Sequence, residues 1–199
     1  MLKALILIFT FFSLISFGQN LDFNKTWTFL GPDQKPEEDK RQAATGIGPV
    51  DHIDVNLLNS KLMLCSSING GLFFTKDGGE RWINSGSDAW DYSGCSWAKY
   101  HPLKENVWFA NSCLNNPNGS AGSIGNQGGI YRTLDEGANW ELIADKSAFV
   151  NSAFINVHGM KFQPKKPNVL FVYTTEGVYY TANCLSKKVE WKRVEGLKG

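Results

Sequence analysis

The stretch GGLFFTKDGGERW, residues 70–82, decides the fold of this chain. A short apolar strand runs there into a turn with the pattern Thr-x-Asp-x-Gly-x-x-Trp. The pattern returns in GIYRTLDEGANW, residues 129–140, and an altered copy covers residues 177–191. The fixed positions are Thr75, Asp77, Gly79 and Trp82 in the first copy, and Thr133, Asp135, Gly137 and Trp140 in the second. Repetition at a spacing of roughly 50 residues indicates a repeat architecture.

Each copy lies at the same place in a unit of four predicted strands. The predicted strands are 50–55, 61–66, 71–75 and 81–84 in the first unit, 96–100, 106–111, 129–133 and 139–143 in the second, and 159–162, 168–173, 177–181 and 190–194 in the third. Four short antiparallel strands per unit are typical of a propeller blade. The sequence therefore predicts an all-β fold, a β-propeller of four-stranded antiparallel blades, with three blades inside residues 50–199, at about 50–86, 93–145 and 156–196.

A lone strand, residues 26–30, precedes the three blades within an N-terminal strand and polar loop at 20–49. Its Trp27 matches only the outer strand of a blade, so we expect it to pair with three strands from the far end of the propeller. Because propellers have four to eight blades, three blades predict a partial propeller from the N-terminal part of a longer protein. A self-standing arc of three blades is the alternative.

Residues 1–19 have the pattern of a secretory signal peptide. Lys3 supplies the positive charge, an apolar run follows it, and Ser16 and Gly18 are the small residues of a cleavage site. A membrane helix is the competing interpretation, but the run is too short to span a hydrocarbon core of about 30 Å. The prediction is a protein that is secreted or held at the cell surface, without a membrane span once the signal is removed.

Charge gives no indication of a nucleic-acid or membrane partner. Without Lys3, acidic and basic side chains balance, and the basic ones are scattered along the chain. Such a chain is not steered toward polyanions. The expected partner is a protein or a glycan, together with the remainder of a longer propeller chain, and no cofactor is expected.

The Asp of the repeated turn is predicted to be structural. Its carboxylate can accept hydrogen bonds from backbone N–H groups further along the turn. Gly79 and Gly137 stand where a positive φ is expected, and the Trp of each copy packs its ring between sheets. A calcium site is the sharper alternative, but it needs six or more oxygen ligands, and one Asp per turn is too few. No metal site is predicted.

These turns resemble Asp-box (BNR) repeats, as found in the propellers of sortilin-type proteins, sialidases and xyloglucan-degrading glycoside hydrolases. The opening of the chain, with Trp27, Gly31-Pro32 and then GIGPV at residues 46–50, is similar to large exported propeller proteins described as sortilin-like or as glycosyl hydrolases. Many of those carry a C-terminal domain for type IX secretion. The resemblance implies the fold and an exported protein; one fold hosts many activities.

Catalytic residues of these families do not carry over. A sialidase needs three arginines and an Arg-Ile-Pro motif, whereas Arg41 precedes Gln42, and Arg81 and Arg132 lie within the repeated turns. The xyloglucan-degrading enzymes place a catalytic Asp just before the Gly-Gly of the first blade, where this chain has SSIN at residues 66–69. Glycoside hydrolysis needs two carboxyl groups at one bond, so no catalytic residue is assigned.

A ligand is expected at the face of the propeller where loops between blades meet the loop between the second and third strands. Residues 112–128 form a long loop rich in Asn, Gly and Ser, which is a candidate for function because such loops sit on a rigid scaffold; a flexible insertion is the alternative. The candidate ligand face consists of Asp51, His52, Trp90, Asp91, Tyr92, Asn115, Asn116 and His158. Aromatic residues that close a loop over the core, and a structural His–Asp pair, are the plainer interpretations.

One disulfide is predicted, between Cys95 and Cys113. The first two strands of the second unit form a hairpin around residues 101–105, which brings these cysteines opposite each other or one residue apart. That suits the short Cα separation of a disulfide. Cys65 is expected to be a buried free thiol, and Cys184 has no evident partner.

Two functions of different classes remain. The first is a non-catalytic, exported propeller segment that binds a protein or glycan or acts as a scaffold in a larger protein. The second is the N-terminal part of a glycoside hydrolase whose catalytic carboxylates lie further along. The missing Asp before Gly70 favours the first.

Overall fold

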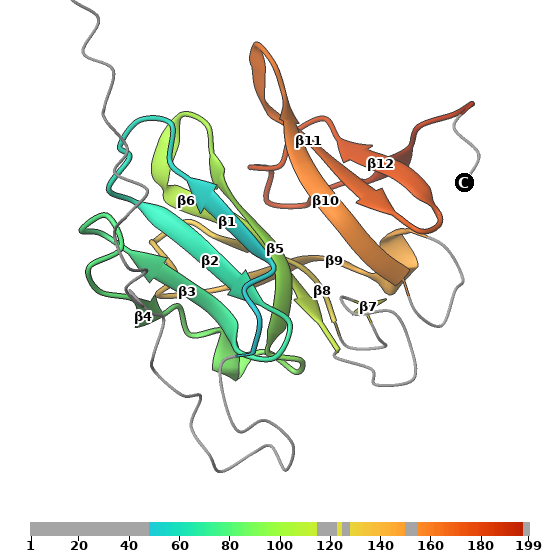
Figure 1. The fold of residues 1–199 in the computed structure, drawn as a ribbon. Helices are drawn as coiled ribbons and strands as arrows, with labels where there is room; N and C mark the ends of the chain where they lie inside the picture. The colour runs from blue at the N-terminus through green and yellow to red at the C-terminus, as the bar shows by residue number, and fades with distance from the viewer. Residues whose placement is uncertain (1–47, 115–122, 125–127, 150–154, 197–199) are drawn as a thin grey trace, which may run out of the picture.

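The computed structural model describes residues 48–114, 123–124, 128–149 and 155–196 (Figure 1). These residues form three antiparallel sheets, here called blades 1, 2 and 3. Blade 1 contains β1 (His52–Val55), β2 (Met63–Ser67), β3 (Gly71–Thr75) and β4 (Ile83–Asn84). Blade 2 contains β5 (Gly94–His101), β6 (Lys104–Cys113), β8 (Gly129–Thr133) and β9 (Glu141–Asp145). Blade 3 contains β10 (Ile155–Gln163), β11 (Lys166–Thr174), β12 (Gly177–Thr181) and β13 (Lys192–Arg193).

Two features were not predicted, and both lie between or beside the blades. The short strand β7 (Ser123–Ile124), from the long loop, pairs with β10 and extends blade 3 on its inner edge. Single-turn 3-10 helices, η2 (Ser87–Ala89) and η3 (Lys146–Ala148), follow the outer strands of blades 1 and 2.

The predicted fold class is confirmed: the described residues are all-β and form a partial propeller of four-stranded antiparallel blades. The third strand of each blade has the predicted limits. The inner hairpins of blades 2 and 3 are longer than predicted, because His101 pairs with Lys104 and Gln163 with Lys166, which leaves two-residue turns. The outer strands β4 and β13 are shorter, with two residues each. The predicted lone strand and the signal peptide lie outside the described residues.

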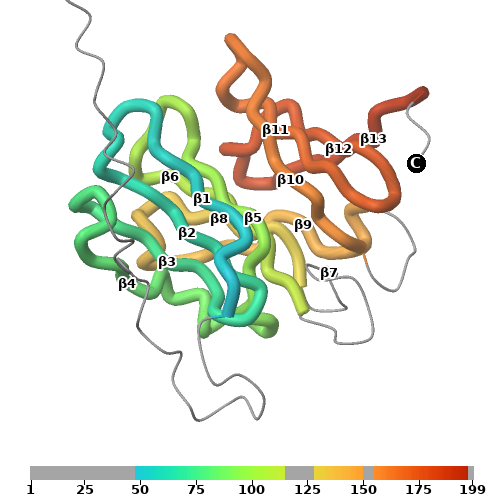
Figure 2. The backbone as a smooth tube through the Cα atoms, in the orientation of Figure 1, coloured from blue at the N-terminus to red at the C-terminus, as the bar shows by residue number. Residues whose placement is uncertain are grey.

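Blade 2 packs face to face with blade 1 on one side and with blade 3 on the other. The inner strands β1, β5 and β10 lie side by side (Figure 2). No helix within the described ranges is long and apolar enough to cross a membrane.

A separate hydrophobic core fills each space between blades. Strand β6 shows how one blade serves two cores, because successive side chains of a strand point to opposite faces. Trp108 belongs to the core shared with blade 1, together with Leu64 and Leu72. Its neighbour Phe109 belongs to the core shared with blade 3, together with Leu170. The blades are therefore held together chiefly by apolar burial on both faces of blade 2.

Truncation of Phe109 tests this layered packing. Phe109→Ala should lower the free energy of unfolding by about 3–5 kcal/mol, because the ring is fully buried between blades 2 and 3. Chemical denaturation of the purified chain measures the change. Leu103→Ala, at a leucine that is 63% exposed, is the control and should change stability by less than about 0.5 kcal/mol. Equal effects of the two substitutions would contradict this packing.

Candidate functional site

The repeated turns of blades 1 and 2 have the same hydrogen bonds. In the first, the Thr75 hydroxyl donates to Asp77 Oδ1 at 2.7 Å and accepts from Gly79 N at 3.0 Å, and Asp77 Oδ1 accepts from Arg81 N at 2.9 Å. The second repeats each bond with Thr133, Asp135, Gly137 and Asn139, at 2.8, 3.0 and 2.8 Å. Gly79 and Gly137 have φ values of +98° and +87°, which only glycine adopts at low cost.

The carboxylates of these turns accept hydrogen bonds from groups of their own turns. Their hydrogen bonds lower the pKa of Asp77, chiefly through Thr75, and the pKa of Asp135, chiefly through Asn139. Within the described ranges, no group of three or more His, Cys, Asp or Glu side chains is placed to hold a metal ion. The turns can thus order the chain and position the tryptophan that follows, but they offer no open coordination site.

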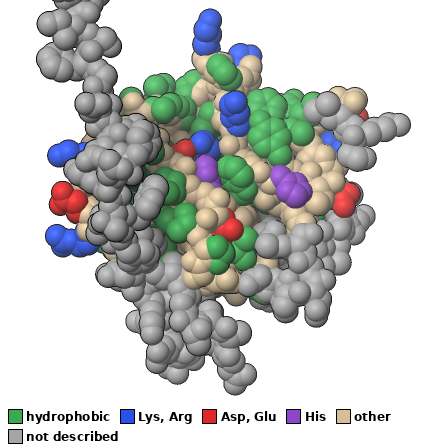
Figure 3. Space-filling model, viewed as in Figure 1, with side chains coloured by type: hydrophobic (Ala, Val, Ile, Leu, Met, Phe, Trp, Pro, Cys, Tyr) green, Lys and Arg blue, Asp and Glu red, His purple; other side chains and the backbone are tan. Residues whose placement is uncertain are grey.

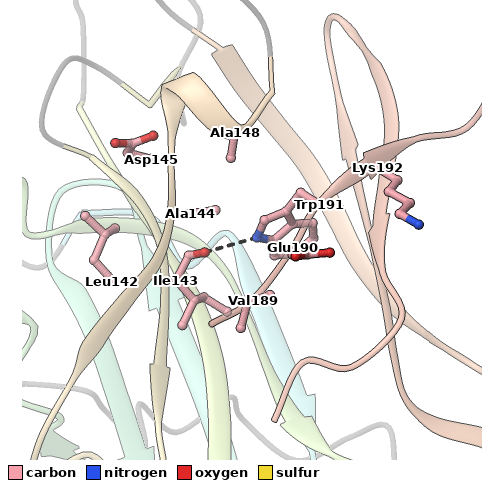
Figure 4. Close-up of a pocket in the computed structure, with 9 residues that line it drawn as sticks. All are labelled: Leu142, Ile143, Ala144, Asp145, Ala148, Val189, Glu190, Trp191 and Lys192. Carbon is pink, nitrogen blue, oxygen red and sulfur yellow. Dashed lines mark hydrogen bonds between the residues drawn. The ribbon is translucent and has the colours of Figure 1, made fainter. Parts of the chain in front are cut away.

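The tryptophans that follow the turns of blades 2 and 3 bond to the preceding blade. Trp140 Nε1 of blade 2 donates to the carbonyl of Ser85, just past β4 of blade 1, at 2.9 Å. Trp191 Nε1 of blade 3 donates to the carbonyl of Ile143, in β9 of blade 2, at 3.1 Å (Figure 4). Ile143 lies at a register shift of β9, so its carbonyl is free of the ladder and available to the indole. We call this bond the indole clasp.

A groove of about 550 Å³ runs beside the second clasp, between β9 and residues 189–192 (Figure 4). The Trp191 ring lies across it and reaches the Ile143 carbonyl. Arg132 ties the same two blades together, because it donates to the carbonyls of Cys184 at 2.7 Å and Ser186 at 2.9 Å. This groove is part of the seam between blades 2 and 3.

The inner strands carry irregularities that expose specific side chains. Strand β5 shifts register between Cys95 and Ala98, and β10 between Val157 and Gly159. Such bulges re-aim side chains and are common beside functional sites. In β5 the extra residues include Trp97, which is partly buried, and in β10 the extra residue is His158, which is exposed.

Asn111 fixes the β5 bulge. Its Oδ1 accepts from Trp97 N at 2.7 Å, and its Nδ2 donates to Ser96 Oγ at 2.9 Å. The Asn111 side chain is fully buried. Because a buried amide with satisfied hydrogen bonds specifies one arrangement, the Trp97 ring is held in a defined place.

The Trp97 ring lies between the inner strands of blades 1 and 3. The His52 ring of β1 packs against it at a tilt of 46°, with centroids 4.1 Å apart. On the other side, a Cβ added to Gly159 of β10 would be 3.8 Å from the indole, so the glycine backbone approaches the ring closely. We call this row the inner-strand face: His52, Trp97, Gly159 and His158, with Asp54 and Lys99 beside His52. Histidine and hydrophobic side chains lie together on this face (Figure 3).

The charges on the inner-strand face cancel. Asp54 accepts from Lys99 Nζ at 2.5 Å and from Tyr100 N at 2.8 Å. Burial lowers the pKa of His52, the positive charge of Lys99 lowers it further, and Asp54 opposes them. His52 is therefore neutral at pH 7, and its Nε2 is buried without a hydrogen-bond partner among the described residues. The face offers an indole, an exposed imidazole and a compensated Asp54–Lys99 pair.

Asp51 brings one carboxylate to the turn between β2 and β3. Its Oδ2 accepts from Ile68 N at 2.7 Å, which lowers the pKa of Asp51, while burial has the larger effect and raises it. Asn69 occupies the position at which the resemblance would place a catalytic Asp. Since Asp54 is held in an ion pair, Asp51 and Asp54 do not form the facing pair of free carboxyls that glycoside hydrolysis uses.

The candidate ligand face from the sequence divides into separate parts. Asp51, His52 and His158 lie at the inner strands. Trp90 is a core residue: it is 7% exposed, stacks on Tyr131 at 4.7 Å and meets Trp140 edge-on at 5.0 Å. It closes the seam between blades 1 and 2, in accordance with the plainer interpretation.

Of its neighbours in the chain, Asp91 is exposed and Tyr92 is partly buried. Asn115 and Asn116 lie outside the described residues. Trp97 and Lys99 were missed, because the bulge that exposes Trp97 is set by the buried Asn111 on another strand.

The prediction of a disulfide between Cys95 and Cys113 is wrong, because all four cysteines are free, buried thiols. The register pairs Cys95 with Ser112 and Gly94 with Cys113, and residues one step out of register point to opposite faces of a sheet. Burial raises the pKa of Cys113 to about 12 and that of Cys65 to about 11. These thiols are therefore protonated and act as small apolar groups.

Solved structures similar to this chain are GH74 enzymes. The chain aligns with an ancestral GH74 enzyme at a TM-score of 0.55 and 18% identity, over 75% of this chain and 19% of that chain. It aligns with the GH74 enzyme of Niastella koreensis at a TM-score of 0.52 and 12% identity, over 75% and 23%. The chain thus spans about a fifth of their length. No family model and no curated protein match it. Such a likeness shows the propeller fold alone.

The indole clasp predicts a difference between two Trp→Phe substitutions. Trp140→Phe removes the bond to the Ser85 carbonyl, whereas Trp90→Phe removes a buried Nε1 that has no partner among the described residues. Leaving an acceptor unpaired costs about 1 kcal/mol or more. Trp140→Phe should therefore destabilise the chain by about 1 kcal/mol more than Trp90→Phe, although Trp90 is the more buried ring. Denaturant titrations of both variants measure this, and a larger loss for Trp90→Phe would contradict the clasp.

Acidification should destabilise the chain in two separate ranges. Burial lowers the pKa of His52 and His101, so the unfolded chain binds these protons more readily, and stability falls as pH drops below about 6.5. His101 Nδ1 also accepts from Leu103 N at 3.2 Å, a bond that protonation removes. The lowered pKa of Asp77 and Asp135 adds a second loss below about pH 4.

Thermal unfolding from pH 8 to pH 3 measures both ranges. His101→Gln should flatten the slope between pH 7 and 5 by up to about 1.4 kcal/mol per pH unit. An unaltered slope in His101→Gln would show that His101 does not carry this dependence.

Proposed function

We propose that this chain is a non-catalytic segment of an exported β-propeller protein, and that its inner-strand face binds a ligand. A neutral glycan is the ligand class that this face fits best. The observation that supports this proposal most directly is the position of the Trp97 indole. The bulge of β5 holds this indole between His52 and Gly159. The Asp-box character of the repeated turns, the sortilin-like resemblance, and export through the segment 1–19 belong to the same proposal.

The chemistry of the face supports a glycan. A sugar presents apolar C–H groups on one face and hydroxyl groups at its rim. The C–H groups can pack on the part of the Trp97 ring that His52 and Gly159 leave uncovered. An exposed imidazole such as that of His158 presents ring nitrogens that can form hydrogen bonds with hydroxyl groups. Because Lys99 and Asp54 neutralise each other, the face gives no advantage to an ionic ligand.

A glycoside hydrolase is the second candidate, favoured by the GH74 enzymes among the similar structures and by Asp51 at the turn between β2 and β3. In that case Asp51 would act with a second carboxyl that lies outside the described residues. The ion pair of Asp54 and the Asn at position 69 support the binding function over this one.

A glycan array followed by calorimetric titration tests the proposal on residues 20–199. We expect binding to one or more neutral oligosaccharides, and Trp97→Ala should weaken it about tenfold or more, since an aromatic contact contributes on the order of 1 kcal/mol. Tyr173→Ala, at an exposed aromatic on the far face of blade 3, is the control. Lack of binding to any neutral glycan, or equal affinity in Trp97→Ala, would contradict the proposal.

The same samples separate the two candidates. If the bound oligosaccharide is cleaved by the full-length protein and Asp51→Asn abolishes the release of reducing ends, the binding-only function is wrong. Binding without turnover in both forms is the expected result.

A further inference from the structure

Blade 3 has an apolar face that turns away from blade 2. Side chains of β11 and β12 alternate: Leu170, Val172 and Tyr179 are buried against blade 2, and their neighbours point to the other side. A groove of about 300 Å³ lies on that other side. Its lining includes the apolar side chains of Phe171, Tyr173, Val178 and Val194, which we call the outer face of blade 3. Tyr173 is 36% exposed, and the other three are partly buried.

The same positions in the other two blades pack against a following blade. By register, Phe171 of blade 3 corresponds to Phe109 of blade 2, and Val178 corresponds to Ile130. Phe109 and Ile130 are fully buried against blade 3. In blade 1 the corresponding Leu64 and Leu72 are fully buried against blade 2. The outer face of blade 3 thus continues a series of two interfaces that the chain already forms.

The acceptor of the indole clasp is also repeated in blade 3. Ser85, which accepts from Trp140, is fixed by the bond from its N–H to the Leu72 carbonyl at 2.9 Å. Val194 makes the equivalent bond to the Val178 carbonyl at 2.8 Å, and Val178 corresponds to Leu72. The Val194 carbonyl therefore stands where a clasp is received, beside the apolar groove.

We infer that the outer face of blade 3 is the docking surface for one further four-stranded blade, whose tryptophan Nε1 donates to the Val194 carbonyl. The partner must present an aliphatic sheet face toward Phe171 and Val178, as blade 3 itself presents Leu170 and Val172 toward blade 2. This inference rests on the proposed role in a larger propeller, but not on the glycan proposal, which concerns the inner-strand face.

A chain extended by one additional blade tests the inference. A second copy of residues 146–196, which contain η3 and blade 3, is joined to the end of residues 20–199. The added copy should dock on the outer face of the original blade 3, because its inward face already fits such a surface. We expect slow hydrogen exchange in the added strands and a rise in Tm of about 5 °C.

Two substitutions show whether docking uses the stated surface. Phe171→Lys in the original blade 3 should abolish protection of the added copy, and Trp191→Phe in the added copy should remove part of the rise in Tm. Leu57→Lys, at a residue of blade 1 that is 84% exposed, should change neither. Fast exchange throughout the added copy, with the original blades still protected, would overturn the inference.

A second measurement tests the alternative that a second copy of the chain covers the outer face of blade 3. If residues 20–199 alone form a stable dimer in light scattering, and Phe171→Lys converts it to a monomer, the surface is covered by a second copy and the inference is wrong. A monomer is expected. Glycan titration of the same samples distinguishes the two proposals, because loss of docking should leave binding at the inner-strand face unchanged.

Discussion

Apolar burial between the blades supports the rest of the structure, and one hydrogen bond recurs across that burial: an indole N–H of one blade donates to a backbone carbonyl of the blade before it. In blade 2 the Thr–Asp hydrogen bonds and the positive-φ glycine bring the chain back over the hairpin to Trp140. In blade 3 an altered turn, with Asn183 in place of Asp, leads to Trp191. Trp140 and Trp191 then reach carbonyls outside their own sheets. The repeated turn is thus a device for joining blades as well as for closing a hairpin.

This device explains why the fold was predictable and the candidate site was not. The turn is local: Thr75, Asp77 and Gly79 act within five residues, so their pattern predicts the strands on either side. The inner-strand face is non-local. Asn111 on β6 decides where Trp97 on β5 points, and strand periodicity does not encode a bulge. The same bulge and register separate Cys95 from Cys113, so the disulfide expected from a regular hairpin was wrong.

The residues that hold the blades together lie apart from the proposed ligand-binding face. Apolar cores and indole clasps lie between the blades, and they leave the inner strands β1, β5 and β10 side by side (Figure 2). Among the strand pairs of the part of the chain that the structure describes, register shifts occur between β5 and β6, between β10 and β11, and between β8 and β9. A rigid scaffold with a few re-aimed side chains suits ligand binding, because little conformational entropy is lost when the ligand binds.

Indole hydrogen exchange tests the central claim most directly, because it reports each clasp without a substitution. In nuclear magnetic resonance spectra of the native chain, the Nε1–H protons of Trp140 and Trp191 should exchange as slowly as the backbone amides of β6 and β11, since both leave their bonds only when blades separate. The Nε1–H of Trp97, at the inner-strand face, should exchange faster. Rapid exchange of the Trp140 and Trp191 indoles beside protected backbone amides would show that these bonds do not hold the blades together.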